Sequence, residues 1–177
     1  DDGDDYEAKL ETLTSNILGY INRLELHDYL QDELRTPNGA NLGLHKAQQI
    51  IPGVFLGGSS VAKDIDKLKE LGITHIVSCV EGLCMYPEDF DYLNIPVCDT
   101  PLENISRHFS TAYEFIRNAL IYYPKGKSNK VYIHCAAGIS RGPTICASFL
   151  MRDLEISSFH ALQLIREARP HVAPNPA

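Results

Sequence analysis

Tryptophan is absent from this sequence of 177 residues, and so are CxxC pairs and long apolar runs. No stretch approaches the roughly 18 consecutive apolar residues that a membrane-spanning helix needs, so we expect no membrane insertion. The hydrophobic share of 44% is ordinary for a globular domain and sufficient for a sizeable core. The chain begins with Asp1 rather than Met and stops abruptly at Ala177, so we expect it to be a piece of a longer protein.

The few cysteines of the sequence bear on whether the protein holds disulfides or a metal site. The five cysteines, an odd number, show neither paired spacing nor a metal-type Cys/His spacing: Cys79, Cys84, Cys98, Cys135 and Cys146. This pattern argues against a disulfide framework and against a zinc site. We therefore expect no metal and no cofactor, and a reducing compartment, either the cytoplasm or the nucleus.

The net charge of −7 is confined to one end of the chain. Residues 1–36 hold ten acidic and three basic side chains, whereas residues 37–177 hold 13 of each. Neither part has the basic surplus that binding to nucleic-acid phosphates requires, so we expect no nucleic-acid partner.

Residues 1–36 are predicted to form an acidic amphipathic helix. Apolar side chains recur there at spacings of three and four, the period of one helix face: Leu10, Leu13, Ile17, Tyr20 and Leu24. Two interpretations stay open, because this helix could pack on the following domain or residues 10–34 could bind a partner or a second copy. Turn-forming residues then assign 37–44 to a linker and 45–177 to the main domain.

The main domain alternates between strand and helix patterns. Short apolar or β-branched runs predict strands at 49–51, 54–57, 73–80, 92–97 and 131–134. Helical periodicity predicts helices at about 60–71, 106–123, 141–153 and 157–168, the last with Ser157 as N-cap. We therefore expect an α/β fold with a central, mostly parallel sheet flanked by helices, together with the extra N-terminal helix.

The run His134-Cys135-Ala136-Ala137-Gly138-Ile139-Ser140-Arg141 joins the last predicted strand to a helix. A loop of small residues at this place can turn its backbone N–H groups inward as an anion-binding nest, and the helix N-terminus adds its positive dipole end. The same groups favour the thiolate of Cys135, which would make it a nucleophile. Gly138 permits a tight turn, and the planar guanidinium of Arg141 can hold two phosphate oxygens.

The segment VYIHCAAGISRGPT matches the HCxxGxxR signature of the cysteine-dependent protein tyrosine phosphatases. The short length and the flanking segments resemble the dual-specificity branch, in its MAP kinase phosphatase-like or atypical form, over residues 45–177. Those segments are IIPGVFLGG, ITHIVSCV, IPVCDT and RPHVAPN. The resemblance implies the dual-specificity phosphatase fold and a protein phosphatase that acts in signalling.

The resemblance also implies a role for each residue of the loop. Cys135 would attack phosphorus and form a cysteinyl-phosphate, while Arg141 and the backbone amides would bind the phosphate oxygens. These amides belong to Ala136, Ala137, Gly138, Ile139, Ser140 and Arg141. His134 would hydrogen-bond the loop and help to keep Cys135 ionised, or it is an ordinary buried histidine. Asn175 matches a position that often hydrogen-bonds near the active site.

A carboxylic acid should protonate the leaving oxygen and later accept a proton from the attacking water. In the family this acid lies on a loop that follows a strand and precedes the cysteine. Asp99, in the segment IPVCDT, matches that place, and Glu103 is the local competitor.

One position departs from the family's pattern. Ser or Thr usually follows the signature arginine and is thought to assist release of the thiolate, whereas this chain has Gly142. We therefore expect slow hydrolysis and accumulation of the phospho-enzyme. Cys98 or Cys84 could serve as a redox partner for Cys135, although inert burial is the simpler expectation.

The variable side chains of the loop, at positions 136, 137, 139 and 140, are uncharged. Phosphatases of inositol lipids or RNA ends commonly carry basic residues there, so we expect a singly phosphorylated protein side chain, on tyrosine or on serine and threonine. A MAP kinase is one candidate, supported only by the leucines in residues 23–26. The alternatives are a glucan phosphatase, which would have Gly in place of Ser140, and a pseudo-phosphatase that only binds phosphoproteins.

Overall fold

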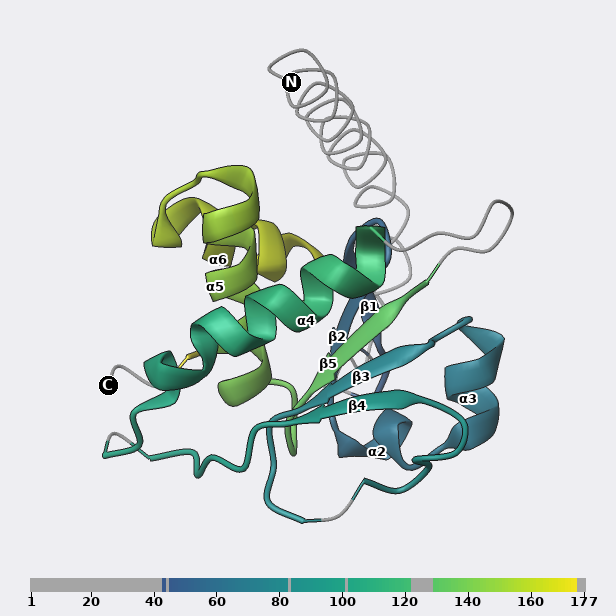
Figure 1. The fold of residues 1–177 in the computed structure, drawn as a ribbon. Coiled ribbons are helices and arrows are strands. Elements are labelled where there is room, and N and C mark those ends of the chain that lie inside the picture. The colour runs from purple at the N-terminus through teal and green to yellow at the C-terminus, as the bar shows by residue number, and fades with distance from the viewer. Residues whose placement is uncertain (1–42, 44, 83, 101, 122–128, 175–177) are drawn as a thin grey trace, which may run out of the picture.

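The computed structural model describes residue 43 and residues 45–82, 84–100, 102–121 and 129–174 (Figure 1). The predicted helix over 1–36, almost all of the predicted linker, and Asn175 lie outside these residues. No helix within the described ranges has the length and apolar character of a membrane span.

Five strands form one sheet in the order β1-β2-β5-β3-β4. They are β1 (Gln48–Ile51), β2 (Val54–Gly57), β3 (His75–Ser78), β4 (Asp91–Asn94) and β5 (Val131–His134). β2, β5, β3 and β4 run parallel, and only β1 pairs antiparallel, through the turn with Gly53 at φ +81°. The prediction of a central, mostly parallel sheet is confirmed.

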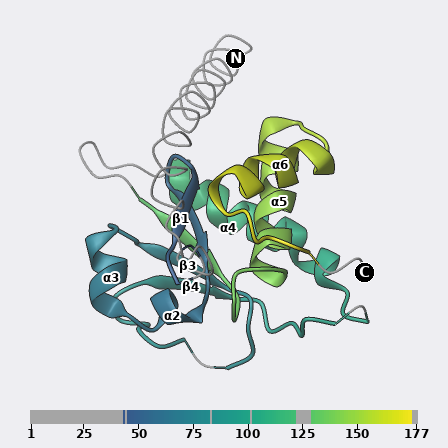
Figure 2. The ribbon, with the colours of Figure 1, turned by 180° about the vertical axis from the view of Figure 1, so that it is seen from behind.

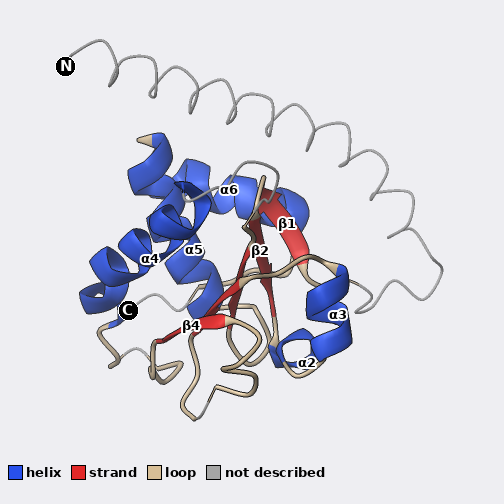
Figure 3. Cartoon of the chain, turned by 45° about the vertical axis from the view of Figure 1, so that its right-hand side comes forward, coloured by secondary structure: helices blue, strands red, loops and turns tan. Residues whose placement is uncertain are grey.

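Helices cover both faces of the sheet (Figures 1 and 2). One face carries α2 (Ser59–Ala62) and α3 (Ile65–Glu70). The other carries α4 (Phe109–Ile121), α5 (Arg141–Leu154) and α6 (Ser158–Ala168), and a 3-10 helix, η1 (Ile105–His108), leads into α4. Figure 3 shows the strands between these two groups of helices.

Alternation along each strand divides the core between the two faces. In β5, Val131 and Ile133 join the larger cluster under α4, α5 and α6, whereas Tyr132 joins the smaller cluster under α2 and α3. β3 repeats the pattern, since Val77 belongs to the first cluster and Ile76 to the second. All five side chains are fully buried, which is why these strands read as continuous apolar runs in the sequence.

Two predicted helices differ from the observed ones at their N-terminal parts. The helix predicted over 60–71 is two helices, because the Asp64 carboxylate accepts a hydrogen bond from the Lys67 N–H (3.0 Å) and starts α3 anew. The helix predicted from Ser106 begins as the 3-10 turn of η1. Ser157 caps α6 as predicted, and its hydroxyl accepts from the His160 N–H (3.2 Å).

Candidate active site

The candidate loop lies at the carboxyl edge of the parallel sheet. β2, β5 and β3 end in register at Gly57, His134 and Ser78, and the loop 135–140 leaves β5 at this edge and enters α5 at Arg141. In open α/β sheets, this edge is where ligands bind. The sheet therefore brings the candidate nucleophile to the edge at which folds of this kind bind their ligands.

Every carbonyl oxygen of the loop accepts a hydrogen bond from outside the loop. Ser59 donates from its hydroxyl to Cys135 O (3.2 Å) and from its N–H to Ala136 O (2.9 Å). The donors to the other four are Arg169 Nη2 to Ala137 O (2.8 Å), Arg169 Nε to Gly138 O (2.8 Å), Ala173 N to Ile139 O (2.8 Å) and Thr144 N to Ser140 O (3.0 Å). Since N–H and C=O point in opposite directions in a trans peptide, the N–H groups of residues 136–141 are turned to the inside of the loop.

Arg169 is one of the loop contacts, together with Ser59 and Ala173, that the sequence does not predict. Its side chain is only 1% exposed, and its guanidinium donates to carbonyl oxygens on both Ala137 and Gly138. Burial lowers the pKa of the Arg169 guanidinium, while charge on Tyr132 and Cys135 works against that shift. In the sequence, Arg169 opens the segment RPHVAPN, which resembles the family, but nothing in that segment indicates that this charge is buried against the loop.

Gly138 holds the loop against the end of β2. Its φ is +67°, in the left-handed region that favours glycine, and a Cβ built there would lie 2.6 Å from the Gly57 carbonyl. Gly58 is similarly close, since its Cβ would lie 2.8 Å from Ala136 O. A side chain would therefore clash at either Gly138, on the loop, or Gly58, just after β2. The tight turn predicted at Gly138 is present.

Arg141 stands at the far end of the loop with part of its guanidinium unused. Its Nη1 donates to Val97 O (3.0 Å), which ties the start of α5 to the segment after β4. Its Nε is buried and has no hydrogen-bond partner among the described residues. A buried N–H without an acceptor is costly, so this group is suited to an anion that enters the loop.

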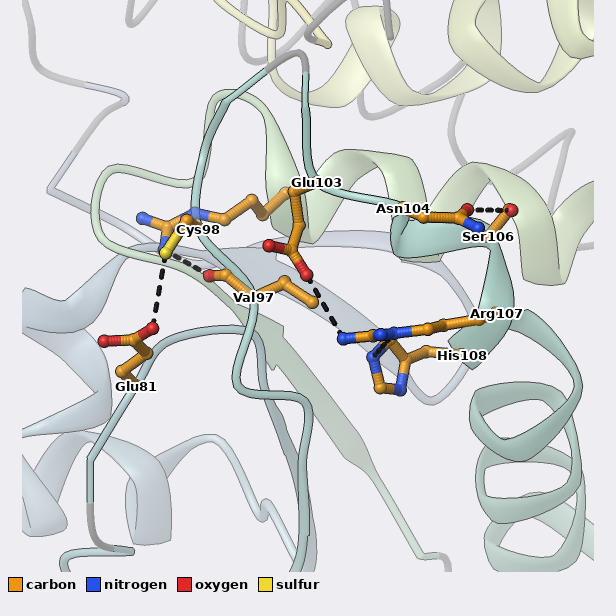
Figure 4. A network of polar contacts seen from close by, with 9 residues as sticks. Glu81, Val97, Cys98, Glu103, Asn104, Ser106, Arg107 and His108 are labelled. Carbon is orange, nitrogen blue, oxygen red and sulfur yellow. Dashed lines mark hydrogen bonds and ion pairs between the residues drawn. The ribbon is translucent and has the colours of Figure 1, made fainter.

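The structure separates the two candidate acids. Asp99 is exposed, and its Oδ1 accepts from the buried Ser140 hydroxyl (2.8 Å), so this carboxylate is tied directly to the loop. Glu103 instead faces Arg107 of η1 at 3.4 Å (Figure 4). Cys135, Arg141 and Asp99 are thus gathered at one place, and Glu103 is engaged by a different element.

His134 is buried at the end of β5 and stacks on Tyr132, with ring centroids 5.6 Å apart. Burial lowers the pKa of His134 to about 4, a hydrogen bond to Cys135 O (3.4 Å) opposes the shift, and the charge of Arg141 adds to it. The ring is therefore neutral at pH 7 and can act on the loop as a hydrogen-bonding group. The expectation that it helps to keep Cys135 ionised stays a prediction.

The other cysteines occupy different environments. Cys98 is exposed and donates to Glu81 Oε1 at 3.3 Å, and this acceptor raises the pKa of its thiol (Figure 4). Cys84 is half-buried, and Cys79 and Cys146 are fully buried. Cys79, Cys84, Cys98 and Cys135 carry free thiols. No cluster of three or more His, Cys, Asp or Glu within the described ranges could hold a metal ion.

Comparison with known proteins agrees with this geometry. Residues 54–177 match the family model of the dual specificity phosphatase catalytic domain. The chain is 39% identical over 131 residues to MAP kinase phosphatase with leucine-rich repeats protein 3 of Dictyostelium discoideum, and 37% identical over 128 residues to dual specificity protein phosphatase 19 of Mus musculus. Each match covers 72% of this chain, but only 14% and 56% of the respective relatives.

The fold is likewise similar to the crystal structure of DUSP15, with a TM-score of 0.68 and 35% identity over 73% of this chain and 80% of that one. The names of these relatives do not favour the glucan phosphatase alternative. The chain belongs to the dual specificity phosphatase family, a branch of the cysteine-dependent protein tyrosine phosphatases, as its signature segment predicted.

Proposed function

We propose that this domain hydrolyses phosphate monoesters on tyrosine and on serine or threonine of proteins, through a cysteinyl-phosphate. The observation that carries the proposal is that all six carbonyl oxygens of the loop accept hydrogen bonds from outside it. The N–H groups of the same peptide units then point to the inside of the loop, where an anion would bind. The buried Nε of Arg141, without an acceptor in the described part of the chain, completes that donor set.

The first step transfers the phosphoryl group to Cys135. The Cys135 thiolate attacks phosphorus, the bond between phosphorus and the ester oxygen breaks, and Asp99 gives its proton to the leaving oxygen. The inward N–H groups and Arg141 bind the other phosphate oxygens as charge develops on them. The contact between Asp99 and Ser140 holds the acid beside the loop.

The second step releases phosphate. Asp99, now a carboxylate, takes a proton from a water molecule, the oxygen of that water bonds to phosphorus, and the S–P bond breaks to return the thiolate. A hydroxyl that donates to the departing sulfur would assist this step. Position 142 is Gly, which supplies none, so hydrolysis of the intermediate is the slow step.

A singly phosphorylated protein side chain is the proposed substrate class, because the loop contributes no charged side chain besides Arg141. A MAP kinase is the proposed partner, since one relative is named as a MAP kinase phosphatase. Residues 10–34, within the acidic segment 1–36, are proposed either to pack on the phosphatase domain or to bind a partner or a second copy. The free thiols of Cys79, Cys84, Cys98 and Cys135 favour the cytoplasm or the nucleus. Deleting 1–36 tests the kinase assignment, which fails if kinase binding and dephosphorylation are unchanged.

The test of function compares three substrates with two variants. We expect turnover of an aryl phosphate and of phosphopeptides, but no release of phosphate from a phosphorylated glucan. Cys135→Ser should abolish turnover, whereas Cys84→Ser, a matched change outside the loop, should leave it intact. Phosphopeptide binding without any turnover would instead assign a pseudo-phosphatase, and a preference for glucan would assign the other alternative.

A further inference from the structure

Arg169 also contacts the start of the described domain, far from the loop in sequence. Its Nη1 donates to Gln48 Oε1 (2.5 Å), to Lys46 O (2.9 Å) and to Gly43 O (3.0 Å). The Gln48 amide closes this cluster, because its Nε2 donates to the same Gly43 carbonyl at 2.8 Å. Gln48 therefore uses both ends of its side chain, and one of them holds Arg169.

The guanidinium of Arg169 thus has two sides with different partners. Nε and Nη2 face Gly138 O and Ala137 O of the loop, and Nη1 faces the beginning of β1. The group is planar and rigid, so the acceptors at Nη1 determine where Nε and Nη2 lie. A displacement at Gln48 would therefore move the donors that orient two peptide units of the loop.

Five of the acceptors around Arg169 are four backbone carbonyls and one side-chain amide. Burial of a charged group is costly unless hydrogen bonds satisfy it, so each of these acceptors helps to hold the guanidinium in place. The Gln48 oxygen is the nearest of the five and the only one that a side-chain substitution removes.

We propose that Gln48 is a positioning residue for phosphate binding, acting through Arg169 on the peptide units after Ala137 and Gly138. These units carry the N–H groups of Gly138 and Ile139, which face the inside of the loop. The inference rests on the proposed function, since it assigns Gln48 to the same phosphate site. Gln48 affects the affinity of the loop for the phosphate group itself and does not affect proton transfer.

The experiment measures binding of inorganic phosphate by calorimetry and turnover of an aryl phosphate in parallel. Gln48→Leu removes the acceptor, and Gln49→Leu, at an exposed neighbouring position on the same strand, is the matched control. Gln48→Glu keeps an oxygen for Arg169 but removes the donor to Gly43. We expect Gln48→Leu to weaken phosphate binding and raise KM by a similar factor of about three to ten, with a smaller change in kcat and an unchanged pH profile.

Gln49→Leu and Gln48→Glu should bind phosphate as the unmodified protein does. The proposal is overturned if Gln48→Leu leaves phosphate affinity unchanged, or if Gln48→Glu loses as much affinity as Gln48→Leu, since the contact to Gly43 would then be responsible. Gln48→Ser, too short to reach Arg169, replaces Gln48→Leu if the latter melts well below the control. Absence of aryl phosphate turnover in the unmodified protein would refute the proposed function instead, and phosphate binding still tests Gln48.

Discussion

Replacing Gly142 by Ser should make this enzyme faster. A Cβ at this position would lie 3.4 Å from the Cys135 N atom and 3.2 Å from Leu56 Cδ1. The first distance places the side chain of residue 142 beside the Cys135 backbone, so we expect a serine hydroxyl there to donate to the Cys135 sulfur. The second is a tight contact with the end of a flexible side chain, which has to shift by a few tenths of an ångström.

The two effects act on different quantities. The tight contact with Leu56 is present in every state of the enzyme, so it lowers the free energy of unfolding by about 1–3 kcal/mol without changing the rate. A hydrogen bond from a hydroxyl to the departing thiolate stabilises the transition state by about 1.5–3 kcal/mol, which corresponds to hydrolysis of the phospho-enzyme that is roughly 10- to 160-fold faster. Gly142→Ala introduces the same Cβ without the hydroxyl, so it isolates the steric part.

Rapid mixing with an aryl phosphate provides the assay. The unmodified protein should release a burst of phenol that approaches one per active site, followed by a slow steady rate. Gly142→Ser should shrink the burst and raise the steady rate, while Gly142→Ala should do neither. A linear time course without a burst in the unmodified protein, or equal acceleration by Ala and Ser, would refute the reasoning.

Three further outcomes can be checked directly. Asp99→Asn should slow turnover of an alkyl phosphate more than that of an aryl phosphate, because a phenolate leaves more readily without a proton. Equal losses of both rates in steady-state assays would contradict Asp99 as the acid and favour Glu103. Arg169→Met should lower the free energy of unfolding, measured in urea, by about 3–5 kcal/mol, because buried carbonyls lose their donor. A loss below about 1 kcal/mol would contradict a structural role of these contacts. The pKa of His134, lowered by burial from 6.5 to about 4, means that the unfolded chain binds a proton first as the pH falls. The free energy of unfolding should therefore be steady above pH 6.5 and decline toward pH 4, and a His134→Asn variant with an undiminished decline would exclude this histidine as the cause.

Sequence periodicity was sufficient for the elements that depend on apolar burial. The strand over 131–134 and the helix that starts at Arg141 lie where they were predicted, because a continuous apolar run and a periodic apolar stretch each fit one buried position in an α/β fold. The break at Asp64 was missed although its signal is local. An acidic side chain three residues before Lys67 can cap a new helix, and the apolar spacing across it was read as one continuous face.

The contacts that shape the loop could not be predicted in the same way. Ser59 is 76 residues from Cys135 in the sequence, and Arg169 is 31 residues from Gly138. Ser59 has no local pattern that distinguishes it from an ordinary surface residue, and the segment RPHVAPN includes Arg169 without indicating what this side chain contacts. The signature segment located the loop and the nucleophile. The donors to the loop carbonyls depend on tertiary packing, which has no signature in the sequence.

The dispersion of those donors along the chain has a consequence for folding. Groups from Ser59 to Ala173 must all be in place before the six carbonyls are held, and that span includes nearly the whole described domain. Contacts of such long sequence separation form late, after most of the loop-closure entropy has been lost. The recovery of turnover during refolding should therefore coincide with the last cooperative phase, so that catalysis reports on completion of the fold and partly folded chains are catalytically silent.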